Sequence, residues 1–332
     1  MEKRIKEAMN EKILDTGSNL FGYNIEDLED LRGFENFVYG YTLNNKQYVI
    51  RFVHSLHRSY DMVLAEIEFI YYLDKHGASV SKLIPSKFER LVERIPLSDD
   101  NYFSVMVFTR APGTFVKEEE LTDEFFYKLG KEIGKLHSLS KTFNPSKRRL
   151  HWHQERYIED NIQFLPEDDD IVISKARNIR SKIQSIPTNR DNYGLIHTDL
   201  HFGNMYYDKG NLTFFDWDDS SYKYFVSDIA IILYYYFVFQ NRDEKDRIGK
   251  TKEIMLPFMK GYNEENNLSP SIWNHLNDFM KLRETILYLV VKADDFGHTN
   301  NPRTKAFLAM LRKNIVEDVP FYENLDFINE MI

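Results

Sequence analysis

One stretch of the sequence, LIHTDLHFGNMYYDKGNLTFFDWDD, combines polar residues with two short apolar segments. The polar residues lie at the ends of these segments: His197, Asp199, Asn204, Asp216 and Asp218. Between the segments, Asp-Lys-Gly-Asn is typical of a tight turn, so we expect a hairpin that makes Asn204 and Asp216 neighbours. Carboxylate and amide oxygens suit Mg²⁺ beside phosphate groups, and Asp199 could accept or orient the proton of an attacking hydroxyl. These are the parts of a phosphoryl-transfer site.

The alternative is that these residues only cap loops at strand ends, where Asp and Asn are common. That explanation accounts for the residue types but not for their spacing. We therefore keep phosphoryl transfer as the main hypothesis.

The same stretch resembles the aminoglycoside phosphotransferase and choline kinase superfamily, whose members are relatives of the protein kinases. HTDLHFGN matches the H-x-D-x-x-x-x-N catalytic loop of that superfamily, and FFDWDD matches its hydrophobic-Asp-hydrophobic-acidic segment. The resemblance implies that Asp199 is the catalytic base and that Asn204 and Asp216 bind Mg²⁺, with Asp218 helping to hold a second metal ion. In the SDIA segment, Asp228 matches an aspartate that braces the catalytic loop, where His197 also serves as structural support.

Asp228 has an alternative interpretation that does not involve the loop. A carboxylate in the first turn of a helix is favoured by the helix dipole alone.

A nucleotide site of this kind needs a basic residue on a strand, fixed by a glutamate on the next helix. Arg51, in YVIRF, is the basic candidate, in the position where protein kinases and the aminoglycoside enzymes have lysine. At about 100° per residue, Glu66 falls in the middle of an apolar helix face, whereas Glu68 points the opposite way. A carboxylate centred on an apolar face needs a cation, and we expect this to be Arg51. The alternative is a surface Glu66 on a helix in a different register.

Two further segments resemble parts of a nucleotide site. RGFENFVYG has only Gly33 and Gly40 and lacks G-x-G-x-x-G, so its backbone should cradle phosphate less extensively. Asn36 is therefore the candidate for a side-chain contact to phosphate. The alternative is that this segment is an ordinary turn. VFTRAPG resembles the hinge that binds adenine through main-chain groups, here the carbonyl of Thr109 and the amide of Ala111.

The elements that must position these residues follow from periodicity. Residue types alternate on both sides of Asn44-Asn45, which predicts a hairpin of strands over 37–43 and 47–52. A helix over 61–77 should end at Gly77, and a further strand is expected over 102–108.

From Thr122, a plausible N-cap, the pattern becomes helical, and Gly130 and Gly134 leave a flat strip for close packing. The last hundred residues are also mostly helical in pattern. We therefore expect an α+β, bilobal, protein-kinase-like fold. An N-terminal nucleotide-binding lobe (1–110) would hold an antiparallel sheet and one key helix, and a larger, mainly helical catalytic and substrate-binding lobe (111–332) would follow.

The composition of the chain indicates which partners and which cellular location to expect. The chain has 332 residues, no cysteine and a formal net charge of −9, which excludes disulfides and argues against nucleic acid as a partner. The N-terminus has no signal-peptide pattern, and the longest apolar run (229–239) is too short to span a membrane. We expect a cytoplasmic protein without a membrane partner; nothing in the sequence indicates its oligomeric state.

The function we expect is a Mg²⁺-dependent transfer of the γ-phosphate of ATP or GTP to a hydroxyl of a small molecule, an amine-bearing alcohol or aminoglycoside-like compound. Residues of HWHQERYIEDN are candidates for the acceptor pocket: Trp152, Glu155, Tyr157 and Asp160. A homoserine-type kinase, a protein Ser/Thr kinase and a non-catalytic nucleotide-binding module are the alternatives. No A-P-E segment follows Asp216, which argues against a regulated protein kinase.

Overall fold

The computed structural model describes residues 3–97, 100–155, 157–162, 165, 169–240, 246–293 and 301–331. Internal contacts divide the chain into two units. The first unit comprises Met1–Phe115, Thr142–Arg149 and Asn204–Asp218, and the second comprises Val116–Lys141, Leu150–Gly203 and Asp219–Ile332. The division into lobes 1–110 and 111–332 stays a prediction.

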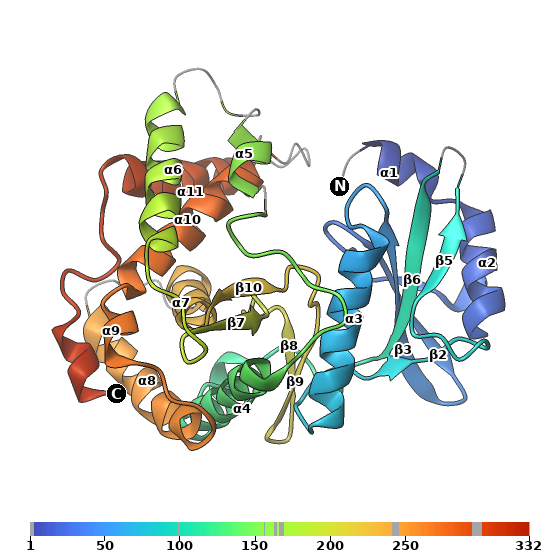
Figure 1. The fold of residues 1–332 in the computed structure, drawn as a ribbon, viewed down its shortest axis with the longest axis horizontal. Coiled ribbons are helices and arrows are strands. Elements are labelled where there is room, and N and C mark those ends of the chain that lie inside the picture. The colour runs from blue at the N-terminus through green and yellow to red at the C-terminus, as the bar shows by residue number, and fades with distance from the viewer. Residues whose placement is uncertain are drawn as a thin grey trace. The chain divides into compact units, whose positions relative to one another are not determined.

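The first unit contains a six-stranded antiparallel sheet (Figure 1). Its order is β1 (Glu29–Asp30), β2 (Phe37–Leu43), β3 (Lys46–His54), β6 (Tyr102–Thr109) and β4 (Leu83–Ile84), and β5 (Glu93–Pro96) also pairs with β6. Asn44 and Asn45 have φ of 51° and 60°, the left-handed conformation that a two-residue hairpin turn requires. The predicted β2–β3 hairpin is therefore confirmed.

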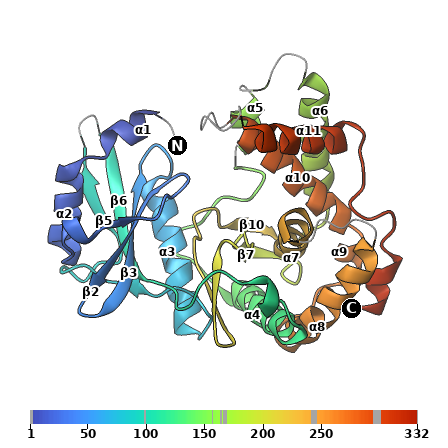
Figure 2. The ribbon, with the colours of Figure 1, turned by 180° about the vertical axis from the view of Figure 1, so that it is seen from behind.

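Helices lie on opposite sides of this sheet, as the two opposite views show (Figures 1 and 2). On one side is α3 (Tyr60–Lys75), which begins after Ser59, whose side chain accepts from the Met62 amide, and which is followed by Gly77 at φ 73°. On the other side is α2 (Glu11–Phe21), which follows α1 (Lys3–Ala8) and precedes the short η1 (Ile25–Asp27). Apolar side chains between α2 and the sheet form a core that includes Ile13, Tyr23, Tyr41, Ile50, Phe52, Phe103 and Val105.

A separate hairpin also belongs to the first unit. It consists of β8 (Met205–Asp208) and β9 (Asn211–Phe214), joined through Lys209 at φ 48° and Gly210 at φ 90°. Isolated bridges tie it to the rest of the unit, from Tyr207 to Thr114 and from Phe214 to Val80. The hairpin predicted from the spacing of polar residues is confirmed.

The second unit is mainly helical around one two-stranded antiparallel sheet of β7 (Tyr193–Ile196) and β10 (Ser221–Tyr224). Among the described residues, its helices are η2 (Glu118–Glu120), α4 (Asp123–Thr142), α5 (Tyr157–Ile162), α6 (Asp170–Gln184), α7 (Val226–Tyr235) with the π-helical η4 (Tyr236–Gln240), α8 (Arg247–Glu265), α9 (Pro270–Trp273), α10 (Leu276–Ala293), α11 (Pro302–Val316) and η5 (Asp326–Glu330).

The glycine strip on α4 has the predicted role in packing. A Cβ on Gly130 would lie 1.9 Å from the backbone oxygen of Phe258, and one on Gly134 would lie 2.6 Å from that of Tyr262. Both contacts are with α8, and Figures 1 and 2 show α4 and α8 side by side. Thr122 accepts a hydrogen bond from the Phe125 amide, so it caps α4 as expected.

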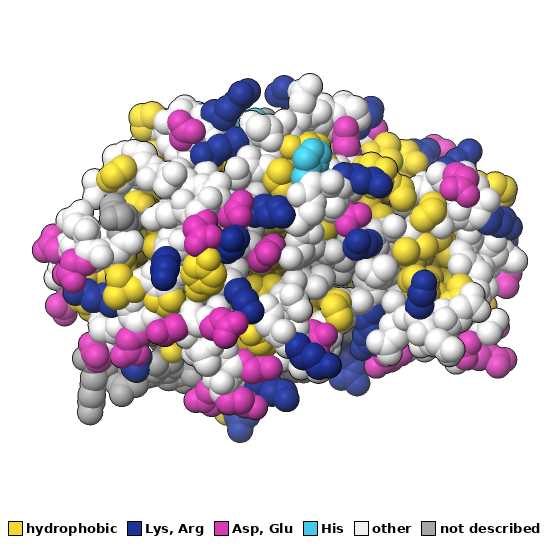
Figure 3. All heavy atoms as spheres, turned by 90° about the horizontal axis from the view of Figure 1, so that it is seen from below, with side chains coloured by type: hydrophobic (Ala, Val, Ile, Leu, Met, Phe, Trp, Pro, Cys, Tyr) yellow, Lys and Arg dark blue, Asp and Glu magenta, His cyan; other side chains and the backbone are white. Residues whose placement is uncertain are grey.

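The apolar run at 229–239 is divided between the buried helix α7 and the π-helical turn of η4. Among the described residues, no helix has both the length and the apolar character needed to cross a membrane. On the face drawn in Figure 3, basic and acidic side chains are interspersed and no extended patch of one sign is formed. The mixed α+β class with an antiparallel sheet is confirmed.

Candidate active site

The β8–β9 hairpin determines where Asn204 and Asp216 lie. Met205 pairs with Phe214, and the Phe215 amide donates to the Asn204 carbonyl at 3.1 Å. Asp216 is therefore one residue beyond the backbone partner of Asn204, as the sequence predicted. Their role as metal ligands stays a prediction.

Asp216 is presented to solvent in an unusual backbone conformation. Its φ is 63°, and its side chain is 57% exposed, while Asn204 beside it is buried. One carboxylate oxygen, Oδ1, lies 3.8 Å from Nη1 of Arg51. A carboxylate and an amide oxygen at neighbouring positions of a hairpin are hard donors of the kind that can hold Mg²⁺ together with water and substrate phosphates.

Arg51 and Glu66 form the predicted ion pair. Nη2 of Arg51, on β3, donates to Oε1 of Glu66, on α3, at 2.5 Å, and both side chains are buried. Burial by itself lowers the pKa of Arg51, but Glu66, Asp218 and Asp216 raise it above its usual value, so the guanidinium stays charged. The contact is confirmed, whereas binding of nucleotide phosphates by Arg51 stays a prediction.

Asp218 lies among basic side chains that were not predicted from the sequence. Its Oδ2 is 2.7 Å from Nε2 of His57 and 3.6 Å from Nε of Arg58, and its carbonyl accepts a hydrogen bond from Arg149. Burial raises the pKa of Asp218, but Arg58 and His57 lower it by more than burial raises it. The pKa of Asp218 therefore lies well below its usual range. Because Oδ2 is already engaged by His57 and Arg58, only Oδ1 could serve the predicted second metal ion, a role that stays a prediction.

Buried polar atoms without a protein partner lie at the predicted nucleotide residues. Asn36 Oδ1, Arg51 Nε and Glu66 Oε2 are inaccessible and make no hydrogen bond to protein. Of the three, only Arg51 Nε is a donor that suits a phosphate oxygen, whereas Asn36 Oδ1 and Glu66 Oε2 are acceptors and would need a donor.

The turn before β2 and the end of β6 hold the remaining nucleotide candidates. A Cβ on Gly33 would lie 2.3 Å from the carbonyl oxygen of Asn36, so the turn closes tightly around that residue. Thr109 ends β6, and its amide donates to the Lys82 carbonyl at 2.8 Å. Ala111 is buried two residues later. Their contacts to adenine stay a prediction.

In the second unit, Asp228 braces the backbone of the predicted catalytic loop. Its carboxylate accepts from the amide of His197 at 3.3 Å and from the amide of Thr198 at 2.9 Å. Thr198 has a φ of 64°, so these bonds hold a strained turn directly before Asp199. Asp228 also lies in the first turn of α7, where the helix dipole favours a carboxylate. Its contacts to the loop and its place in the helix therefore agree with both interpretations of this residue. His197 is buried beside it.

Asp199 is held by two donors. Nη2 of Arg283, on α10, donates to Oδ1, and Nε2 of His201 lies 3.4 Å from Oδ2. Burial raises the pKa of Asp199, but Arg283 and the nearby histidines lower it more, and the net result is a pKa far below the usual value. Asp199 is therefore a carboxylate at neutral pH.

Arg283 was not predicted from the sequence, although its position on α10 carries a signal. On α10, Arg283 follows Leu276, Phe279 and Met280 at helical spacing, so it continues a buried row. A lone cation on such a row calls for a carboxylate, by the same reasoning that selected Glu66.

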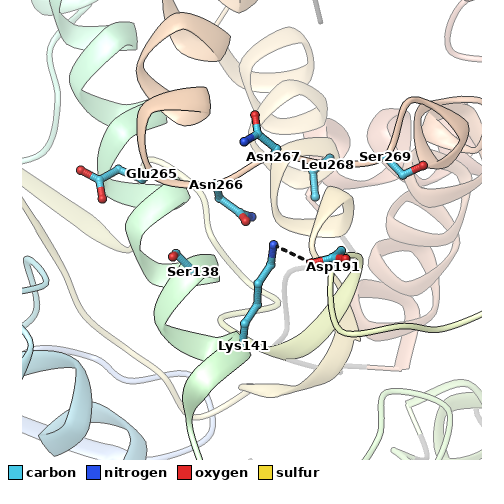
Figure 4. Close-up of a pocket in the computed structure, with 8 residues that line it drawn as sticks. All are labelled: Ser138, Lys141, Asp191, Glu265, Asn266, Asn267, Leu268 and Ser269. Atoms are coloured by element: carbon cyan, nitrogen blue, oxygen red, sulfur yellow. Dashed lines mark hydrogen bonds and ion pairs between the residues drawn. The ribbon is translucent and has the colours of Figure 1, made fainter.

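A cavity of about 490 Å³ lies elsewhere in the second unit (Figure 4). Its lining is mostly polar and contains none of the predicted site residues: Ser138, Lys141, Asp191, Glu265, Asn266, Asn267, Leu268 and Ser269. Lys141 crosses it to reach Asp191 at 3.4 Å.

Two of the acceptor-pocket candidates can be compared with the structure. Trp152 is buried, and the ammonium of Lys223 lies 5.9 Å from the centroid of the Trp152 ring. The side chain of Tyr157 lies outside the described residues.

Comparison with known proteins decides the family. Residues 28–260 match the phosphotransferase enzyme family, which is more than half of the chain. The chain belongs to the phosphotransferase enzyme family. A curated relative, amicoumacin kinase of Bacillus subtilis (strain 168), is 33% identical over 324 residues, which cover 96% of each chain.

Solved structures of other phosphotransferases share the fold. An amicoumacin kinase in complex with AMP-PNP, Ca²⁺ and Ami has a TM-score of 0.92 at 31% identity, over 99% of this chain and 100% of that one. A microcompartment-associated aminopropanol kinase has a TM-score of 0.73 at 18% identity, over 93% and 98%. A spectinomycin phosphotransferase has a TM-score of 0.58 at 16% identity, over 97% of each chain. The kinase-like fold and the phosphotransferase class expected from the sequence are confirmed.

Proposed function

We propose that this phosphotransferase transfers the γ-phosphate of ATP, with Mg²⁺, to a hydroxyl group of an amicoumacin-type antibiotic. The observation that carries the proposal is the similarity to amicoumacin kinases along nearly the whole chain, in sequence and in structure. One of these relatives holds an ATP analogue, a divalent cation and Ami together. A donor such as ATP agrees with a cytoplasmic location, and neither a membrane nor nucleic acid is needed as a partner.

In the proposed reaction, the residues of the first unit bind the donor. Asn204 and Asp216 would hold Mg²⁺, which when bound neutralises charge on the transferring phosphoryl group. Arg51, kept in place by Glu66, would contact the nucleotide phosphates. Asn36 would add a side-chain contact, and the main chain at Thr109 and Ala111 would recognise adenine.

The acceptor would be handled by the second unit. Asp199, a carboxylate at neutral pH, would accept a hydrogen bond from the acceptor hydroxyl and orient its oxygen towards phosphorus. Because its pKa is low, its main contribution is orientation, and it takes up the proton only as the new P–O bond forms.

The test is a transfer assay on the purified chain. With MgATP and amicoumacin, we expect a product that carries one added phosphate group by mass spectrometry, and no product when Mg²⁺ is removed with EDTA. Parallel reactions with aminopropanol, choline, homoserine, spectinomycin, an aminoglycoside and a generic protein substrate measure selectivity, and GTP tests the donor. If another acceptor is phosphorylated and amicoumacin is not, the proposal of an amicoumacin-type substrate is wrong.

A further inference from the structure

Asp199 and three side chains around it form a closed ring of contacts. Nη2 of Arg283 donates to Oδ1 of Asp199 and also to the hydroxyl of Tyr235, and the Arg283 guanidinium lies 4.9 Å from the Tyr235 ring centroid. Tyr235 stacks on His201, with ring centroids 4.5 Å apart and planes 7° from parallel. His201 returns to Oδ2 of Asp199 at 3.4 Å. Arg283, Tyr235 and His201 are not among the residues proposed above to bind the donor, the metal ion or the acceptor.

The contacts of His201 determine which of its nitrogens faces Asp199 as a donor. Nδ1 accepts a hydrogen bond from the Gly203 amide at 2.9 Å, so in the neutral ring the hydrogen is on Nε2. Nε2 faces Oδ2 of Asp199. Both carboxylate oxygens therefore have a donor.

The two donors differ in strength. The guanidinium contact is a charge-assisted hydrogen bond, whereas the imidazole contact at 3.4 Å is longer than a good hydrogen bond. An incoming hydroxyl would therefore replace His201 at Oδ2 much more readily than it would replace Arg283 at Oδ1.

We propose that Arg283 is the positioning residue of the catalytic carboxylate, holding Oδ1 of Asp199 so that Oδ2 is presented to the acceptor hydroxyl. The hydroxyl takes the place of the long His201 contact. The Tyr235 hydroxyl accepts from the same Nη2, and its ring contacts the guanidinium, so Tyr235 helps to fix the position of Arg283. This inference rests on the proposed function, because it assumes that Asp199 faces the acceptor.

The surroundings of Asp199 explain why one arginine dominates its charge state. Arg283 approaches from α10, Tyr235 from the end of α7, and Lys223 from β10, while His197 and His201 lie on the loop of Asp199 itself. The anions in the same region are Asp219 and Asp228. Of the cations, Arg283 has the largest effect on the pKa of Asp199, and it cannot lose its proton in the physiological range.

A second ion pair in the same unit provides a control for Arg283. If Arg283 had only a structural role, breaking either ion pair should have a similar effect on the enzyme. Nε of Arg312 donates to Oδ1 of Asp169 at 2.6 Å, and the Tyr288 hydroxyl donates to Oδ2 at 2.7 Å. This is again an arginine, an aspartate and a tyrosine, and none of the three belongs to the catalytic loop, residues 197–204. Arg312→Met is therefore the control for Arg283→Met.

The experiment compares wild type, Arg283→Met, Arg283→Lys and Arg312→Met, with rates corrected for the folded fraction by circular dichroism. For Arg283→Met we expect kcat with MgATP and amicoumacin to fall on the order of 100-fold, while KM for ATP stays near wild type. The acid limb of kcat should move to higher pH, as the pKa of Asp199 returns towards its usual value of about 4. Arg283→Lys should recover part of the rate, and Arg312→Met should keep both kcat and the acid limb.

A measurement that needs no substrate accompanies the kinetics. The carboxyl carbon of Asp199, followed by ¹³C NMR, should titrate at clearly higher pH in Arg283→Met than in wild type. An unchanged titration, or a wild-type kcat in Arg283→Met, would overturn the inference. If wild type does not phosphorylate amicoumacin, the proposed function fails, and the NMR result then decides the Arg283–Asp199 coupling by itself.

Discussion

Arg51 and Glu66 lie in the interior of the first unit with Nη2 and Oε1 2.5 Å apart, and less than 5% of either residue is exposed. Breaking a buried pair leaves an uncompensated charge, which typically costs about 3–5 kcal/mol. We therefore expect Glu66→Ala to lower the free energy of unfolding by an amount near the lower end of this range, because Asp216 and Asp218 still face Arg51. Urea denaturation measures it.

The control for Glu66 is on the same helix. Glu68 is only half-buried and accepts hydrogen bonds from the amide and hydroxyl of Ser146. Glu68→Ala should cost about 1 kcal/mol and leave ATP binding intact, whereas Glu66→Ala should also weaken ATP binding. Equal effects of the two variants on ATP binding would contradict the role assigned to Glu66.

Asp216→Ala should weaken the binding of Mg²⁺ at the proposed metal site. Loss of a direct ligand should raise the Mg²⁺ concentration for half-maximal transfer by more than the roughly 10–100-fold typical of an outer-shell partner. The stabilisation of the fold by MgATP in a thermal shift assay should decrease in parallel. Asp208→Ala, at the turn of the same hairpin, is the control. A wild-type Mg²⁺ requirement in Asp216→Ala would remove this residue from the metal site.

Gly130→Ala should destabilise the protein. The new Cβ would lie 1.9 Å from the Phe258 carbonyl oxygen, which is backbone, so α4 and α8 would have to separate. Overpacking of this kind typically costs about 1–3 kcal/mol. Thermal denaturation would show the loss, and Ser138→Ala on the same helix should stay close to wild type. An unchanged melting temperature for Gly130→Ala would mean that the helices are not packed as closely as described.

Because Lys223 is buried, we expect it to make the free energy of unfolding depend on pH. Burial, followed by the effect of Arg283, lowers its pKa from 10.5 to about 8. Between these two values the unfolded chain binds more protons than the folded chain, so the contribution of Lys223 to the unfolding free energy rises with pH. Below the folded pKa, the full cost of a buried charge is present.

Lys223→Met removes that cost. The variant should be more stable than wild type at neutral pH, and the difference should shrink as the pH rises from about 8 towards 10.5. Urea unfolding of both proteins at a series of pH values measures the difference, in which the titration of all other groups largely cancels. A difference that is constant across this window would show that Lys223 is not desolvated in the folded state.

Local sequence signals predicted much of the first unit. Asn44-Asn45 and Lys209-Gly210 favour left-handed turn residues, and these turns set the register of both hairpins. Glu66 was selected because helical periodicity alone decides which of two glutamates faces the core. These predictions needed only neighbouring residues.

The missed residues depend on contacts between distant parts of the chain. His57 and Asp218 are 161 residues apart, and Arg283 and Asp199 are 84 residues apart. His57 lies in a polar loop, HSLHRSY, where nothing marks one residue as a partner. The position of Arg283 on a buried helical row was visible in the sequence, but the identity of its carboxylate partner is set by tertiary packing.

The most direct test of the account is the rate of phosphoryl transfer by Asp199→Asn. The amide keeps the size of the side chain and removes its charge and its ability to take a proton. We expect kcat with MgATP and amicoumacin to fall by about 10²–10⁴-fold, while the thermal stabilisation by MgATP persists. A variant that transfers phosphate at the wild-type rate would contradict the assignment of Asp199 as the catalytic base.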